Sequence, residues 1–208
     1  MHIENGLYTL LIDSINSVDK RYRLFTYWSS QKYPSKLRER VFCYELYHQI
    51  RKKQEESAYR DIDVNGEPDK RGQERFAHIT GPIPDMIIHK AGAKYANYIV
   101  LEAKCNLSGQ EKNPKSGNPT GVYKDFKNLA DFILTARYKY GVFLAIGVKE
   151  RSLNKKFTKL AHFLCDNYPN DIETIFSALR IIRLDEQDGS MTQYLPQNSE
   201  GEYLLKQI

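Results

Sequence analysis

The sequence has 208 residues, of which 41% are hydrophobic and 27% charged, and a formal net charge of +5. This composition is typical of a soluble globular protein with a sizeable core. No apolar run approaches the roughly 18 residues of a membrane span, so we expect no membrane-spanning segment.

The cysteines and the N-terminal residues indicate the cellular compartment of the protein. Cys43, Cys105 and Cys165 are odd in number, lie far apart and form no zinc-binding spacing, which argues against a disulfide framework. The first residues lack the basic start and apolar block of a signal peptide. Together these features predict a cytoplasmic protein in a reducing compartment.

Two amphipathic helices are expected near the start of the chain. Apolar residues recur at helical spacing over residues 3–16, and again from about residue 36 to 55, with Ser35 as a candidate N-cap. Within the second helix, Glu45 is the one charge in the apolar run 41–47. A buried carboxylate needs a partner, either an ion pair with Arg38 or Arg40 or a role in a site.

Short strands are expected between residues 61 and 89. Residues 61–64 resemble a strand, and Asn65-Gly66 is a hairpin turn signal with residues 76–79 as the returning strand. A further apolar strand, 85–89, begins at Asp85 directly after Pro84.

The segment 97–105 is the clearest strand of the sequence. It begins as a short apolar run and ends in Glu102, Ala103 and Lys104. Side chains alternate along a strand, so Glu102 and Lys104 share a face while Ala103 points away. If this strand forms a hairpin with 85–89, Asp85 and Glu102 lie side by side at one edge of the sheet. Without such a hairpin, Glu102 and Lys104 are read as a structural ion pair.

The remaining chain is predicted to alternate between helices and strands and to carry a basic segment. Residues 111–159 hold 11 basic and 4 acidic side chains, which suits a polyanionic ligand or, alternatively, a solvated lysine-rich face. The expected elements are a loop at 106–121, helices at 122–138, 152–166 and about 172–179, a strand at 140–148, and a C-terminal hairpin of 179–185 with 191–195.

This order of elements predicts an α/β protein with a central mixed sheet of four or more strands flanked by helices. With Pro84-Asp85 and Glu102-Ala103-Lys104 on neighbouring strands, it resembles the PD-(D/E)XK nuclease superfamily, which has the restriction-endonuclease-like fold. The resemblance covers roughly residues 35–150. It implies a single nuclease domain over 1–208 with helical N-terminal and helix-and-hairpin C-terminal additions.

The resemblance also implies a catalytic site that binds Mg²⁺, with Mn²⁺ able to substitute. By this resemblance, Asp85 and Glu102 supply carboxylate ligands, the carbonyl of Ala103 supplies a third oxygen, and Glu45 binds a second ion or orients a metal-bound water. Lys104 would position and polarise the attacking water. Lys112, Lys115, Lys124 and Lys127 are the candidate contacts to the nucleic-acid backbone.

The function expected from these residues is metal-dependent hydrolysis of DNA, in restriction, defence or repair, with RNA as the alternative substrate. Specificity would come from loops, a homodimer or a partner protein. The competing hypothesis is a catalytically inactive module of the same fold that binds nucleic acid or a partner. A third is an unrelated α/β protein in which Asp85 lies far from Glu102.

Overall fold

The computed structural model describes residues 2–23, 39–67, 83–93, 95–105, 107, 119–185, 187–199 and 202–208. Its centre is a seven-stranded mixed sheet whose strands follow the order of the chain. The pairs β3–β4 and β4–β5 are parallel, and the other neighbouring strands are antiparallel. The strands are β1 (Asp63–Gly66), β2 (Met86–His89), β3 (Asn97–Cys105), β4 (Tyr140–Ile146), β5 (Leu179–Leu184), β6 (Met191–Ser199) and β7 (Glu202–Gln207).

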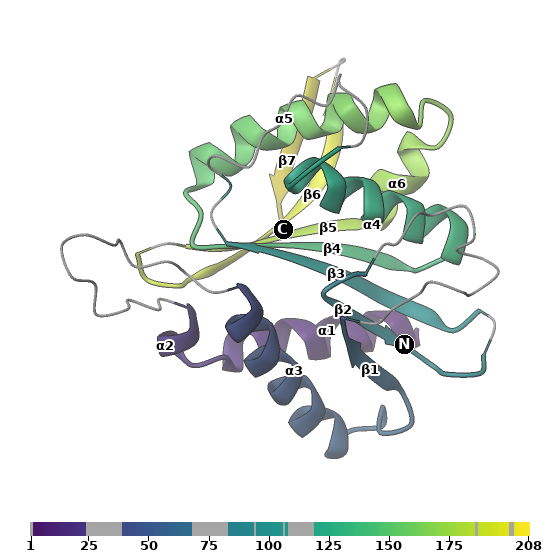
Figure 1. Ribbon diagram of the computed structural model, residues 1–208, viewed down its shortest axis with the longest axis vertical. Helices are drawn as coiled ribbons and strands as arrows, with labels where there is room; N and C mark the ends of the chain where they lie inside the picture. The colour runs from purple at the N-terminus through teal and green to yellow at the C-terminus, as the bar shows by residue number, and fades with distance from the viewer. Residues whose placement is uncertain are drawn as a thin grey trace.

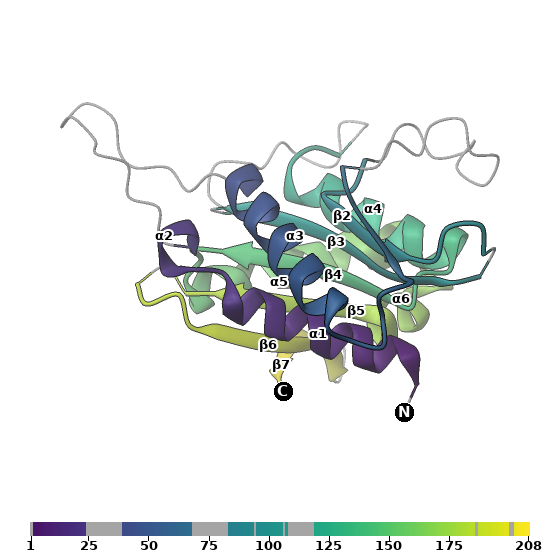
Figure 2. The same ribbon diagram turned by 90° about the horizontal axis from the view of Figure 1, so that it is seen from below.

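Helices cover both faces of this sheet and make a three-layer molecule (Figure 1). Figure 2 shows the layer formed by the N-terminal helices from its outer side. No helix among the described residues is long and apolar enough to cross a membrane. The first layer contains α1 (Ile3–Ser17), α2 (Lys20–Arg23) and α3 (Glu39–Glu55), and the second contains α4 (Val122–Ala136), α5 (Glu150–Asn167) and α6 (Ile172–Ala178).

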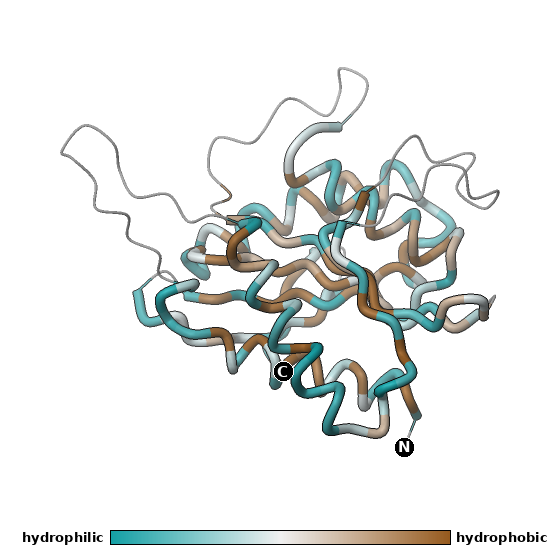
Figure 3. The backbone as a smooth tube through the Cα atoms, turned by 60° about the horizontal axis from the view of Figure 1, so that its bottom comes forward, coloured by the Kyte–Doolittle hydropathy of each residue, from teal (hydrophilic) through white to brown (hydrophobic). Residues whose placement is uncertain are grey.

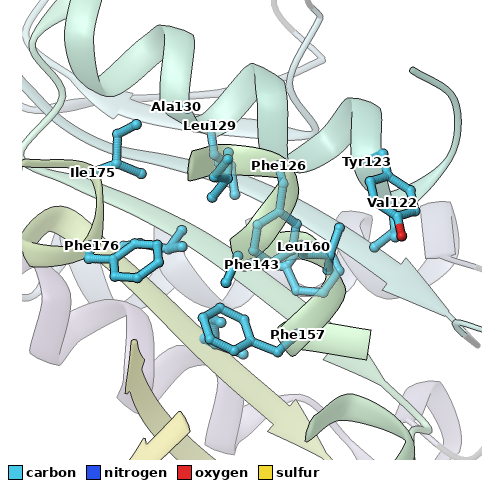
Figure 4. Close-up of a cluster of buried hydrophobic side chains, with 14 of the residues drawn as sticks. Val122, Tyr123, Phe126, Leu129, Ala130, Phe143, Phe157, Leu160, Ile175 and Phe176 are labelled. Atoms are coloured by element: carbon cyan, nitrogen blue, oxygen red, sulfur yellow. The ribbon is translucent and has the colours of Figure 1, made fainter. Parts of the chain in front are cut away.

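Two hydrophobic clusters hold the three layers together, one on each face of the sheet. Alternate residues of one strand belong to different clusters: Val100 packs with the α4 layer, whereas Leu101 and Ala103 pack with the α3 layer. In the α4 layer, the rings of Phe126 and Phe143 lie 4.7 Å apart between centroids (Figure 4). Hydrophobic segments recur along both the helices and the strands (Figure 3), and β4 is buried along nearly its whole length, so burial of apolar surface between the layers favours their assembly.

The parallel connection between β3 and β4 brings two strand ends to one edge of the sheet. The chain leaves β3 at Cys105, crosses the sheet face through α4 and returns along β4, where Cys105 pairs with Ile146. Both strands therefore end at the same edge. Polar side chains at the end of β3 meet the start of β2 there, because β2 runs antiparallel to β3.

The α/β class, the mixed sheet and the hairpin between β5 and β6 confirm the predictions from the sequence. The turn expected at Asn65-Gly66 is wrong, because both residues belong to β1 and pair with Ile87 and Met86. A contact of 2.8 Å between Asn65 Oδ1 and His89 Nε2 accompanies this pairing. The expected strand 76–79 and the N-cap Ser35 lie outside the described residues.

The C-terminal strand β7 was not expected. The expected strand ends at residue 195, but β6 continues to Ser199, and its residues from Tyr194 to Ser199 pair with β7. Proline is tolerated at this point because β6 pairs with β5 only as far as Tyr194. Pro196 therefore faces no β5 carbonyl that requires its missing N–H.

Candidate active site

The candidate site lies at the carboxyl end of β3, where polar side chains interrupt an otherwise apolar strand. Val100 packs on the α4 side, so by alternation Glu102 and Lys104 also project to that side. Ala103 is buried on the α3 side. Glu102 contacts Asn128 and Lys104 contacts Asp125, both on α4, which confirms the predicted shared face.

Asp85 lies opposite Glu102 across the hairpin. Met86 pairs with Leu101, so the same antiparallel register places Asp85 against Glu102 one step further along. The Ala103 N–H donates a hydrogen bond of 2.7 Å to Asp85 Oδ2, which uses one of the two carboxylate oxygens. Since the N–H and C=O of one strand residue point to the same side, the Ala103 carbonyl also faces Asp85.

Glu102 is almost fully buried, with 5% of its surface exposed. Asn128 of α4 donates a hydrogen bond of 3.2 Å from Nδ2 to Glu102 Oε1. Burial raises the pKa of Glu102 well above its ordinary value, and the nearby Asp125 and Asp85 carboxyls raise it further. A proton or a cation beside Glu102 is therefore strongly favoured over an isolated carboxylate.

Lys104 lies between carboxylates from two helices. Its Nζ is 3.1 Å from Asp125 Oδ2 on α4 and 3.5 Å from Glu39 Oε1 at the start of α3. The second Glu39 oxygen accepts a hydrogen bond of 3.3 Å from the Cys105 N–H. Burial opposes the charge on Lys104, but the Asp125 and Glu39 carboxylates outweigh it and raise the pKa above its ordinary value.

The cluster holds more acid than one ammonium can neutralise. Four carboxyl groups, on Glu39, Asp85, Glu102 and Asp125, interact with Lys104 or with one another. Burial raises the pKa of Asp85 to about 6, and it raises the pKa of Asp125 to about 6 as well. Such an arrangement is stabilised by added protons or by a cation.

The oxygen donors at this end of the strands are two carboxylates and one backbone carbonyl. Among the described residues, no three acidic, histidine or cysteine side chains converge closely enough to hold an ion by themselves. Mg²⁺ usually takes one or two carboxylates and keeps several waters. Asp85, Glu102 and the Ala103 carbonyl are oxygen donors of that kind, and they meet at one sheet edge.

The raised pKa values predict how stability depends on pH without metal. A carboxyl whose pKa is higher in the folded state binds its proton more tightly there, so its stabilising contribution is complete below its unfolded pKa and is lost as the pH rises. The stabilising contributions of Asp85 and Asp125 should be lost between about pH 4 and pH 7, since both residues have pKa values of about 6 in the folded state. Two pKa units correspond to roughly 3 kcal/mol per group as an upper bound.

Urea unfolding in EDTA at several pH values across this window measures the effect. The free energy of unfolding should fall as the pH rises, and Asp125→Asn should flatten the dependence because it removes one of the three carboxyls with a raised pKa, the others being Asp85 and Glu102. A free energy that is constant or increases with pH would contradict the prediction.

The structure does not bring Glu45 into the cluster, so the expectation that Glu45 faces it is wrong. Glu45 Oε1 accepts a hydrogen bond of 2.7 Å from Gln49 on the same helix. Glu39, six residues earlier, supplies the α3 carboxylate. Six residues turn a helix by about 240°, so the two side chains project in different directions. The alternative pairing with Arg40 is also absent, because Arg40 Nε bonds Glu67 Oε1 at 3.0 Å; Arg38 lies outside the described residues.

Three residues of the cluster were missed from the sequence. Glu39 begins its helix, and Asp125 and Asn128 lie one turn apart on α4 among buried apolar neighbours. The spacing of Asp125 and Asn128 on the buried side of an amphipathic helix was a usable signal. The lysines at 124 and 127 mask this spacing, because they give the segment a basic character.

The expected nucleic-acid contacts have mixed outcomes. Lys112 and Lys115 lie outside the described residues. Lys124 is exposed on α4 next to Asp125. Lys127 forms an ion pair of 2.6 Å with Asp131, which occupies its ammonium. Lys124 therefore remains the better placed candidate for a phosphate contact.

Comparisons with models of protein families, with curated proteins and with solved structures gave no match to this chain.

Proposed function

We propose that this protein is a divalent-metal-dependent nuclease of the PD-(D/E)XK type that hydrolyses phosphodiester bonds of DNA. The observation that carries the proposal is the convergence of Asp85, Glu102 and Lys104 at one sheet edge, with an excess of acid around a single ammonium. A purely structural ion pair would need one acid for Lys104, whereas four carboxyl groups interact within this cluster.

Different residues of the cluster would have different roles in hydrolysis. Asp85, Glu102 and the Ala103 carbonyl would hold Mg²⁺ or Mn²⁺, which when bound supplies Lewis-acid stabilisation of phosphate charge and a more acidic water. Lys104 is held as an ammonium by Asp125 and Glu39, so it donates hydrogen bonds and cannot act as a base. Its task is to orient the attacking water and to stabilise the negative charge that develops on the phosphate oxygens.

Asp125, Asn128 and Glu39 would act by positioning these groups. Asn128 orients the Glu102 carboxylate through its hydrogen bond to Oε1. Asp125 and Glu39 fix the Lys104 ammonium from opposite layers of the molecule. Exposed Lys124 is a candidate for binding the DNA backbone, a contribution that weakens with salt and does not depend on base sequence.

Incubation with supercoiled plasmid, linear duplex and single-stranded DNA tests the proposal, each with Mg²⁺, with Mn²⁺ and with EDTA. We expect cleavage with either metal and none in EDTA, because phosphate hydrolysis at this site needs a bound cation. The same incubations with single-stranded RNA show whether the substrate is DNA or RNA. A protein that binds DNA but cuts no substrate with either metal would instead be the catalytically inactive module.

A further inference from the structure

A cavity of about 420 Å³ opens beside the candidate site, between α3 and the start of β2. Its lining includes Glu39 and Asp85 of the site together with Tyr44 and Tyr47 of α3. The volume lies in the range of pockets that bind small organic groups. This cavity therefore shares Glu39 and Asp85 with the candidate site, and its remaining lining residues have no part in the proposed cleavage chemistry.

Two tyrosine rings at this cavity are open to solvent. Tyr44 is 62% exposed and Tyr47 is 37% exposed. With Arg40 and Cys43 they occupy positions three and four residues apart, so all four share one side of α3. Aromatic rings that line a pocket and remain accessible offer flat surfaces on which another ring can stack.

The charges around the cavity select against an anion. Its lining includes three carboxyl side chains, on Glu39, Glu67 and Asp85, against the guanidinium of Arg40, which already pairs with Glu67 at 3.0 Å. A phosphate would be repelled there, whereas a neutral ring that carries N–H groups could donate hydrogen bonds to the carboxylates. A nucleobase has both properties, a flat aromatic face and N–H donors at its edge.

We propose that this pocket receives one unpaired nucleobase of the substrate, stacked on Tyr44 and Tyr47, next to the phosphate that is cut at the candidate site. The binding of a base follows from the lining of the cavity. Its place beside the cut phosphate rests on the proposed nuclease function. A base can enter the pocket only when it is unpaired, so the site favours single-stranded or locally opened nucleic acid over intact duplex.

Binding to a short single strand in EDTA tests the pocket separately from cleavage. The probe is a labelled DNA oligonucleotide of about six nucleotides, close to the smallest site sizes known for single-strand binders, and its affinity is measured by fluorescence anisotropy. Tyr44→Ala should weaken binding about 5- to 100-fold, as expected for the loss of one stacking surface. Tyr44→Phe should bind like wild type because it keeps the ring, and RNA of the same sequence tests whether the sugar matters.

Tyr95→Ala is the matched control. Tyr95 is 61% exposed, nearly the same as Tyr44, but lies at the β2–β3 turn, far along the sheet from the site. This variant should bind the oligonucleotide like wild type. A second series of oligonucleotides carries one abasic nucleotide at successive positions. At one of these positions the abasic nucleotide should weaken binding to the wild type but not to Tyr44→Ala, because removing the base and removing the Tyr44 ring abolish the same stacking contact.

These experiments test base binding in the pocket separately from the proposed nuclease activity. If Tyr44→Ala and Tyr47→Ala bind the single strand like wild type, or if no abasic position depends on Tyr44, the pocket is refuted even where the protein cuts DNA. If binding depends on Tyr44 but neither Mg²⁺ nor Mn²⁺ gives cleavage, the base pocket stands and the nuclease function fails. If the protein cuts, the Tyr44-dependent position should lie directly beside the cleaved bond, and a distant position would refute that placement.

Discussion

Lys104→Ala is expected to reduce metal-dependent DNA cleavage by at least about 100-fold, the scale of a lost group that acts on the attacking water or on transition-state charge. The variant should still bind DNA and divalent metal, since Lys104 is a ligand to neither. Its metal-free form should be less stable by about 3–5 kcal/mol, because Asp125 and Glu39 lose the cation between them. Added Mn²⁺ should restore part of that stability.

The loss of folding and the loss of catalysis must be separated in the same experiment. Lys104→Arg keeps a positive charge between Asp125 and Glu39, so it should melt close to wild type while its bulkier head group fails to orient the water. Lys206→Ala, an exposed change on β7, should leave both cleavage and melting unchanged. A Lys104→Ala protein that is folded and cuts at the wild-type rate would rule out the catalytic role.

Glu102→Gln is expected to abolish cleavage and, unusually for a buried change, to stabilise the metal-free protein, by on the order of 1 kcal/mol. The amide has nearly the same shape but carries no charge, so it removes the repulsion from Asp85 and Asp125. Its Oε1 still accepts the hydrogen bond from Asn128, and its NH₂ group can donate to the neighbouring carboxylates. Function and stability should therefore change in opposite directions.

Thermal melts with and without Mn²⁺ measure the stability of Glu102→Gln and its response to the ion. The wild type should gain stability from the ion, since a ligand that binds only the folded state stabilises it, and Glu102→Gln should gain much less. Glu150→Gln changes an exposed residue at the start of α5 and should respond to Mn²⁺ like wild type. If Glu102→Gln keeps the full Mn²⁺-induced gain, Glu102 is not a ligand.

The parts of the site that lie on strands could be predicted from the sequence. The bounds of β3 and the common face of Glu102 and Lys104 follow from the two-residue repeat of a strand. The position of Asp85 follows from antiparallel pairing of consecutive strands. These are local rules. They hold at the site end of the β2–β3 pair, where the register is regular, and the one shift in register lies between Ile88 and His89, away from the site.

The parts of the site that lie on helices could not be predicted in the same way. Which α3 carboxylate reaches Lys104 depends on how the helix is rotated and where it begins, and both are set by packing against α1 and the sheet. Glu45 looked like the buried acid because it stands alone in an apolar run, yet Glu39 at the helix start makes the contact. Sequence spacing fixes neighbours along one helix but not the direction that the helix presents to the sheet.

The hydrogen bond from the Ala103 N–H to Asp85 Oδ2 has a mechanical consequence. It ties the side chain of one proposed ligand to the backbone of the strand that carries the other, so Asp85 and Glu102 move as a single unit. Glu39 and Asp125 belong to separate helices and can shift relative to that unit. Small changes in helix packing would thus alter the distances from Glu39 and Asp125 to Lys104, while the separation of the Asp85 and Glu102 carboxylates stays constant. The site would then consist of two carboxylates held at a fixed distance and two that can move relative to them.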